Sequence, residues 1–193
     1  IGKRPADGAD PGAPWTWLGA NGFAAFHAAA GADGAGYVLG GTAWDLTHPA
    51  RLPERPFDLL VVDEAGQYSL ADTIAVSDAA RNLLLLGDPQ QLPQVTQGRH
   101  PEPVDRSALG WLTDGHDTLP DELGYFLART WRMHPALADV VSRLAYEGRL
   151  AAVPAAAARR LEGVPPGVGH VLVAHEGNAV ASVEEAAEVV RQV

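Results

Sequence analysis

The chain has 193 residues, of which 47% are hydrophobic and 20% charged, a balance that allows a buried core and excludes wholesale disorder. The formal net charge of −10 excludes attraction of polyanions by bulk electrostatics, so any contact with nucleic acid must come from local arginines, backbone groups and stacking. The absence of cysteine excludes disulfides, Cys-ligated zinc and thiol catalysis; because the sequence also has no membrane-length apolar run and no signal-peptide pattern at its start, we expect a cytoplasmic chain outside the membrane.

The first half of the sequence predicts strands separated by helices. Residues 1–20 read as a linker, and an Ala-rich helix is expected over 21–30. Three short segments are almost continuously apolar and predict strands: 37–41, 57–62 and 82–87. Such runs are typical of strands that are buried on both faces of a parallel sheet. The segment 69–81 between the last two has helical length and composition, which predicts a βαβ unit.

The second half predicts fewer elements. A polar loop over 96–104 precedes a short helix over 107–112. A helix should begin at Pro135, because proline suits the first helical turn, and should stop at Gly148. Further expectations are strands at 124–128 and 170–174, a surface connection at 151–160, and a final helix from 182 on, where Ser182 and Glu185 have capping-box spacing.

Two adjacent carboxylates, Asp63 and Glu64, follow the apolar run FDLLVV. Side chains at the carboxyl end of a parallel strand face the crevice where α/β proteins bind ligands. One carboxylate together with nucleotide phosphates can hold Mg²⁺, and the second can orient or deprotonate a water. The alternative is a solvated, inert acidic pair at a strand end, and the residues alone leave both interpretations open.

The segment GDPQQLPQV, residues 87–95, follows the next predicted strand. Gly87 is expected to allow a sharp turn, and Asp88 brings another acid toward Asp63 and Glu64. The amides of Gln90 and Gln91 can donate and accept hydrogen bonds, so they could sense a terminal phosphate or its water. A simple polar turn is the alternative.

The segment TWRMHP, residues 130–135, places Arg132 at a strand-to-helix junction. Arginine is the preferred bidentate ligand of phosphate, although a lone arginine is more often a surface ion-pair partner. Trp131 is expected in the core and His134 in a structural role.

A phosphate-binding GxxxxGK loop is missing from this sequence. The one lysine, Lys3, lies in IGKR with no strand before it. We therefore expect the sequence to be a segment of a longer protein that carries this loop elsewhere.

Taken together, VVDEAGQ (61–67), GDPQQLPQV and TWRMHP resemble, in order, motif II, motif III and motif IV of superfamily 1B helicases, the branch of the nonsense-mediated-decay helicase. GGTAW (40–44) resembles a nucleic-acid-binding motif of that family. The resemblance covers residues 35–193 and is closest to bacterial proteins that fuse a RecB-like nuclease to a helicase module.

The resemblance implies an α/β fold, the RecA-like parallel sheet of P-loop NTPases. It implies a linker at 1–20, the later part of a first RecA-like domain at 21–122, and the start of a second at 123–193. Later motifs of the family, like the P-loop, would lie outside this sequence.

The resemblance also implies Mg²⁺ and ATP as cofactors and gives roles to single residues. Asp63 would bind Mg²⁺ and Glu64 would activate the water, while Asp88, Gln91 and Gln67 would lie at the nucleotide, with both glutamines sensing its γ-phosphate. Arg132 would reach that phosphate from the second domain. Thr42 and Trp44 would contact single-stranded nucleic acid, more readily DNA than RNA.

The leading hypothesis is a fragment of an ATP-dependent helicase or translocase that is inactive by itself. A second hypothesis is a binding or scaffold module with a decayed helicase fold. A third is a metal-dependent hydrolase that uses Asp63, Glu64 and Asp88.

Overall fold

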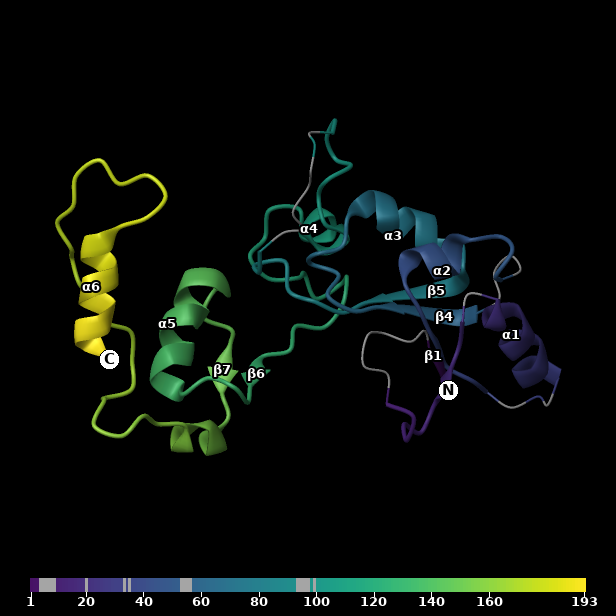
Figure 1. Cartoon of the computed structure of the whole chain (residues 1–193), viewed down its shortest axis with the longest axis horizontal. Helices are drawn as coiled ribbons and strands as arrows, with labels where there is room; N and C mark the ends of the chain where they lie inside the picture. Colours follow the sequence, from purple (N-terminus) through teal and green to yellow (C-terminus); the bar gives the residue numbers. More distant parts are fainter. Residues whose placement is uncertain are drawn as a thin grey trace. The chain divides into compact units, whose positions relative to one another are not determined.

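Figure 1 shows the computed structural model, which describes residues 1–3, 10–19, 21–32, 34, 36–52, 57–92, 98 and 100–193. Part of the predicted linker, 4–9, and part of the predicted polar loop, 96–97 and 99, therefore lie outside the described residues. The chain forms two compact units, here called unit 1 (Ile1–Phe126) and unit 2 (Leu127–Val193). The sequence places a domain boundary at 122/123, a few residues before this division.

Strands and helices alternate along much of unit 1. Its elements are β1 (Gly2–Lys3), β2 (Thr16–Trp17), α1 (Gly22–Ala32), β3 (Leu39–Gly40), α2 (Ala43–Thr47), β4 (Phe57–Val62), α3 (Leu70–Ser77), β5 (Ala80–Leu85) and α4 (Ala108–Thr113). Those of unit 2 are β6 (Arg129–Thr130), α5 (Pro135–Ala145), β7 (Ala151–Ala152), the 3₁₀ helix η1 (Pro154–Ala158) and α6 (Val183–Gln192).

The predicted βαβ unit is confirmed by β4, α3 and β5. The two strands pair in parallel, with Val62 opposite Leu85 at their carboxyl ends. Helix α3 begins after Ser69, whose hydroxyl accepts a hydrogen bond from a backbone N–H in the first turn. Val76 on α3 and Leu60 on β4 belong to one buried cluster, so the helix covers one face of this sheet.

The expectation that these strands are buried on both faces is wrong for the part of the chain that the structure describes. Leu60 and Val62 are buried, but Leu59 and Val61, which point to the other face, are 51% and 47% exposed. Side chains alternate across a strand, and α3 packs on the face that carries Leu60 and Val62.

The start of the chain forms a sheet, although the sequence predicts a linker there. Strand β1 is central and pairs in parallel with β2 and with β3. Gly2 is buried, and a Cβ at this position would lie 2.7 Å from the Leu18 side chain. Leu18 packs with Phe23 of α1 and with Leu52 in a second buried cluster. Helix α1 confirms the prediction of a helix near 21–30.

Unit 2 is built around α5 and the parallel pair β6–β7. Helix α5 begins at Pro135 as predicted, and the His134 ring accepts a hydrogen bond from the N–H of Ala136. It ends where the N–H groups of Tyr146 and Gly148 both donate to the Ser142 carbonyl. Helix α6, capped by Ser182, confirms the last predicted helix.

Three expectations for this region are wrong. The predicted strand at 124–128 is replaced by β6, which begins one residue later. Residues 170–174 form no strand and pair with none of the described strands, and Leu172 is 91% exposed. The segment 151–160 is more than a surface connection, since it forms β7 and η1 and buries Val153 and Ala156.

Helices and parallel strands alternate in both units, so the chain is a mixed α/β protein, consistent with the predicted RecA-like class. No helix in the described ranges is long and apolar enough to cross a membrane.

Candidate functional site

The turn that follows β4 exposes the two predicted carboxylates. The Asp63 carboxylate accepts a hydrogen bond from the N–H of Glu64 at 3.0 Å, and the N–H of Gln67 donates to the Glu64 carbonyl at 2.8 Å. Glu64 has a φ of 56°, in the left-handed region that residues other than glycine seldom adopt. The chain therefore reverses directly after the strand, and both acidic side chains are exposed at its end.

The turn after β4 and the loop after β5 are in direct backbone contact. Hydrogen bonds from Ala65 to Leu86 (2.8 Å) and from Leu86 to Val62 (2.9 Å) extend the pairing beyond the strands. A Cβ on Gly66 would lie 2.1 Å from the Asp88 carbonyl oxygen, and one on Gly87 would lie 2.7 Å from the Ala65 nitrogen. Gly87 is thus required by close backbone approach, whereas the sequence suggested a sharp turn.

Asp88 organises the loop after β5. Its carboxylate accepts hydrogen bonds from the N–H of Gln90 at 3.0 Å and from the Gln91 side-chain amide at 3.3 Å. The Gln90 amide turns to Asp117, donating to its carbonyl oxygen at 3.1 Å and its carboxylate at 3.3 Å. The structure therefore joins Asp117 to this loop, a residue that sequence reasoning missed because no local pattern marks it.

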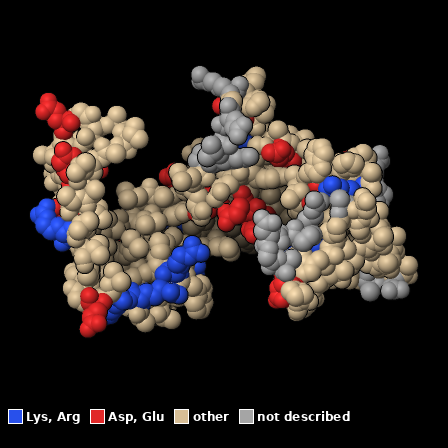
Figure 2. All heavy atoms as spheres, viewed as in Figure 1, with Lys and Arg blue, Asp and Glu red and all other residues tan. Residues whose placement is uncertain are grey.

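Acidic side chains gather where β4 and β5 end, as Figure 2 shows near the centre of the view. Asp63 and Glu64 make no ion pair with any residue in the described ranges. Exposed carboxylate oxygens are suitable ligands for Mg²⁺ when phosphates supply further oxygens. The described residues contain no group of three or more His, Asp or Glu that could hold a metal ion, so Asp63, Glu64 and Asp88 form no preassembled three-carboxylate site.

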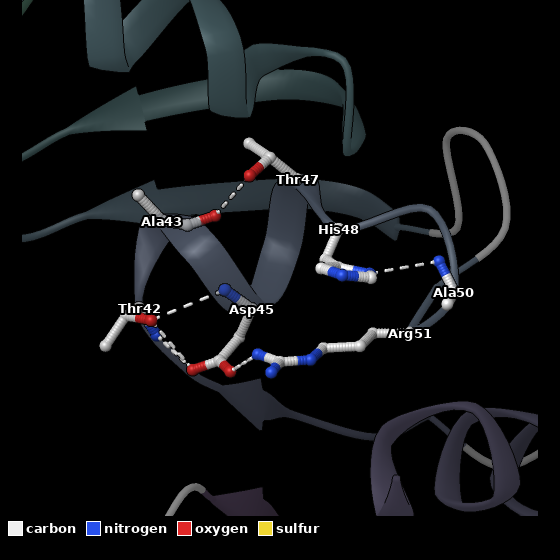
Figure 3. A network of polar contacts seen from close by, with 7 residues as sticks. All are labelled: Thr42, Ala43, Asp45, Thr47, His48, Ala50 and Arg51. Carbon is white, nitrogen blue, oxygen red and sulfur yellow. Dashed lines mark hydrogen bonds and ion pairs between the residues drawn. The ribbon is translucent and has the colours of Figure 1, made fainter. Parts of the chain in front are cut away.

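Thr42 and Trp44 lie at the start of α2, and Figure 3 shows the network of polar contacts around Thr42. Thr42 is the N-cap: its backbone N–H and its hydroxyl donate to the Asp45 carboxylate at 3.0 and 2.8 Å, and its hydroxyl oxygen accepts from the Asp45 N–H. This reciprocal arrangement is a capping box. Trp44 is 67% exposed, with its ring edge-on to His48 at 5.7 Å between centroids.

Asp45 is the centre of this network and is 1% exposed. Arg51 forms an ion pair with its carboxylate, and the His48 ring accepts a hydrogen bond from the Ala50 N–H in the intervening turn. Sequence reasoning missed Asp45 and Arg51, although the TxxD spacing of Thr42 and Asp45 is a recognisable capping signal.

Arg132, Trp131 and His134 belong to unit 2. The Arg132 side chain is exposed, and its backbone N–H donates to the Thr130 hydroxyl at 3.3 Å. Trp131 is 70% exposed, so its predicted core position is wrong. His134 caps α5, which confirms its structural role.

Two tyrosines of unit 1, Tyr37 and Tyr68, have raised pKa values. Burial raises the pKa of Tyr37, and Asp58 raises it further. Burial also raises the pKa of Tyr68, with a contribution from Asp72. Both phenols therefore stay protonated and neutral over the physiological range.

Comparison with known proteins adds to this geometry. Residues 46–98 match a family model described as an AAA domain. The chain is 33% identical to DNA-binding protein SMUBP-2 of Rattus norvegicus over 116 residues, which are 59% of this chain and 11% of that protein. It is 28% identical to DNA replication ATP-dependent helicase/nuclease DNA2 of Bos taurus over 115 residues, which are 58% of this chain and 10% of that protein.

The matching human DNA2 protein is also 28% identical over 115 residues. The chain thus spans only about a tenth of the length of the curated relatives that it matches. The AAA-domain match and these relatives support a similarity of the chain to superfamily 1 helicase-like proteins.

Proposed function

We propose that this chain is part of an ATP-dependent helicase or translocase that couples hydrolysis of Mg²⁺-ATP to movement on single-stranded nucleic acid. The observation that carries the proposal is the backbone contact between the Gly66 turn and the Gly87 loop. This contact holds Asp63 and Glu64 beside the loop that carries Gln91, and these groups are among those that such hydrolysis uses.

Each of these groups has a role that its chemistry suits. Asp63 would bind Mg²⁺ through its exposed carboxylate, and Glu64 would accept a proton from water. Gln91, held by Asp88, and Gln67, in the same turn as Glu64, would orient that water near the terminal phosphate. Mg²⁺-ATP, when bound, would supply the phosphate that is transferred to water.

Unit 2 would contribute Arg132 to the same phosphate, because a guanidinium can stabilise the charge that develops during transfer. Thr42 and Trp44 would contact the nucleic acid, and the exposure of Trp44 supports base stacking there. We propose DNA as the partner rather than RNA, because the names of the matched relatives refer to DNA.

The longer protein would supply the phosphate-binding loop and the later helicase motifs. A RecB-like nuclease domain in that protein is part of the proposal, as is a role in DNA repair or nucleic-acid processing. The chain alone would bind ATP weakly and hydrolyse none.

The test is DNA-stimulated ATP hydrolysis by the full-length protein and its Glu64→Gln variant. Loss of a general base lowers turnover by about 100-fold or more. Glu122→Gln removes an exposed carboxylate of the same unit and should leave turnover unchanged. Normal turnover in Glu64→Gln contradicts the assigned role, and a full-length protein that binds DNA without hydrolysis supports the scaffold hypothesis instead.

A separate measurement addresses the chain alone. ATP turnover by these 193 residues that Glu64→Gln abolishes would refute the expectation that the chain is inactive by itself.

A further inference from the structure

The Gln90 side chain joins the loop after β5 to a distant segment of unit 1. Its amide nitrogen donates to the Asp117 backbone carbonyl at 3.1 Å and to the Asp117 carboxylate at 3.3 Å. The two residues are 27 positions apart in the sequence, and the link uses both N–H bonds that this nitrogen can offer. The link therefore fixes the direction of the Gln90 side chain as well as the place of the loop.

Helix α4 brings Asp117 to this loop. Leu109 on α4 is buried in the same cluster as residues of β4 and α3, and a Cβ on Gly87 would lie 3.1 Å from the Leu109 side chain. The helix is thus packed against the start of the loop after β5 (Figure 1). After the helix, Asp114 and Gly115 have φ of 44° and 86°, and this left-handed turn reverses the chain. The reversal places Asp117 beside Gln90.

The short segment that carries Asp117 is itself held in unit 1. Thr113 and Thr118, one on each side of Asp117, are both 4% exposed. The N–H of His116 donates to the Thr113 carbonyl at 3.0 Å, which closes the turn between them. The backbone is therefore anchored on both sides of Asp117, although its own side chain is exposed.

The link to Asp117 completes the support of the turn that carries Gln91. The turn begins at Asp88, whose carbonyl oxygen would lie 2.1 Å from a Cβ on Gly66. Inside the turn, the Asp88 carboxylate accepts from the Gln90 N–H and from the Gln91 amide. These internal bonds move with the turn, whereas the bond from Gln90 to Asp117 joins it to another element. The turn is consequently held at Asp88 and again at Gln90.

We propose that Asp117 is a positioning residue for ATP hydrolysis, because it holds Gln90 and thereby the turn that presents Gln91. The inference rests on the proposed function, in which Gln91 orients the attacking water. A glutamine amide on an unsupported exposed loop samples many directions, and fixing it beforehand removes that loss from the reaction. Asp117 acts through Gln90, so it need not touch the nucleotide.

The experiment measures DNA-stimulated ATP hydrolysis by the full-length protein as separate kcat and KM values. Asp117→Ala removes the carboxylate and leaves the backbone carbonyl, whereas Gln90→Leu removes both hydrogen bonds. A hydrogen bond of ordinary strength corresponds to a factor of about 2 to 10, so kcat should fall about 3-fold in Asp117→Ala and about 10-fold in Gln90→Leu. The KM for ATP should stay within about 2-fold, because an interaction needed only in the transition state is lost.

Two further variants separate positioning from a merely structural role. Asp117→Asn keeps an oxygen acceptor at the same position and should restore kcat to within about 2-fold of the unchanged protein. The double variant Gln90→Leu/Asp117→Ala should have the kcat of Gln90→Leu alone, because no bond is left for the second substitution to remove. Losses that multiply in the double variant would overturn the inference, since the two residues would then act independently.

The matched control is Glu122→Ala, which removes an exposed carboxylate from the same segment. Its kcat and KM should equal those of the unchanged protein, and an equal fall in kcat would mean that any lost negative charge has this effect. The urea midpoint of each variant shows whether it is folded. A fall in kcat that is matched by the fraction of unfolded protein would also overturn the inference.

The outcomes distinguish this inference from the proposed function. If Glu64→Gln loses turnover while Asp117→Ala and Gln90→Leu keep their kcat, the positioning role fails and the proposed function stands. If Glu64→Gln has normal turnover, or the full-length protein hydrolyses no ATP, both fail together. A higher KM with unchanged kcat in Gln90→Leu would overturn the inference alone, because the loop would then bind ATP without orienting the water.

Discussion

The two units place their charged side chains differently. Unit 1 buries an ion pair, Asp45–Arg51, whose side chains are 1% and 14% exposed, and exposes the carboxylates of Asp63 and Glu64 where β4 ends. Unit 2 keeps the pair Asp139–Arg143 on its surface, at 66% and 67% exposure, and gathers unpaired arginines near η1. Both side chains of the pair in unit 1 are thus shielded from solvent, whereas in unit 2 the buried Glu188 pairs with Arg191, which is 76% exposed.

The loops after β4 and β5 in unit 1 and the segment around η1 in unit 2 are also held by different kinds of contact. Backbone atoms fix the turn after β4 against the loop after β5, with no room for a side chain at Gly66 or Gly87. In unit 2, a side-chain hydrogen bond from the Arg159 Nε to the Trp131 carbonyl links η1 to the residue after β6. A substitution at Gly66 or Gly87 should therefore destabilise unit 1, whereas a substitution at Arg159 should change only the local contacts of η1.

The largest difference is expected between Asp45→Ala and Asp139→Ala. Asp45→Ala leaves the Arg51 guanidinium without its partner in a mostly buried place, which should cost about 3–5 kcal/mol in the free energy of unfolding. Asp139→Ala removes an exposed i,i+4 pair and should cost at most about 0.5 kcal/mol. Urea unfolding of both variants measures the two values, and equal costs would contradict the distinction drawn between the units.

A second difference concerns the backbone contact in unit 1. Gly66→Ala would place a Cβ 2.1 Å from the Asp88 carbonyl oxygen, so the two loops must separate. We expect a decrease of about 1–3 kcal/mol or more in the free energy of unfolding, as for other overpacked positions. Gly19→Ala is the matched control, because its Cβ would meet nothing within 4 Å. A Gly66→Ala chain as stable as the control would show that this contact is loose.

The sequence alone predicted correctly those strands whose apolar residues are matched by a neighbouring strand for backbone pairing. The run 57–62 became β4, and the run 82–87 overlaps β5, which begins two residues earlier, because a crossover helix of suitable length lies between them and covers one face. The run 170–174 has the same apolar character, yet it has no pairing strand and stays exposed. An apolar run specifies a strand only when the chain provides a neighbour for its backbone hydrogen bonds.

The candidate site was predictable to a similar degree. Asp63 and Glu64 follow β4 and Gln91 lies in the loop after β5, so the parallel pairing of the two strands places their loops side by side. The partner of Gln90, Asp117, comes from a loop far along the chain and carries no local signal. Whether these residues perform the roles that the resemblance implies stays a prediction.

The N-caps of α3 and α6 allow a third comparison of the two units, with a smaller expected effect on the free energy of unfolding. Ser69→Ala removes the N-cap of α3, and because Thr73 and Val76 of this helix are buried, the cost of about 1 kcal/mol should lower the stability of unit 1. Ser182→Ala removes the N-cap of α6, where Val183 and Val190 are 81% and 77% exposed. Its effect should be lower helicity, without a comparable shift in the main urea transition. Circular dichroism and tryptophan fluorescence distinguish the two results.

The smallest predicted effect is on the titration of Glu184 in unit 2. Its own backbone N–H, the Asn178 amide and the Ser182 hydroxyl lower the pKa of this carboxyl below its usual value of 4.5. Because folding lowers this pKa, these hydrogen bonds stabilise the start of α6 above pH 4.5, and the stabilisation disappears as the pH falls through the lower value of the folded state. Asn178→Ala should raise the Glu184 pKa toward 4.5, as read from carboxyl chemical shifts in an NMR pH titration.

The control for this titration is Asn82→Ala, which removes a side-chain amide in unit 1 and should leave the Glu184 titration unchanged. If the Glu184 pKa is unaltered in Asn178→Ala, the Asn178 amide does not contribute to it. The backbone N–H and the Ser182 hydroxyl would then account for the lowered pKa, and the loop before α6 would have no part in it.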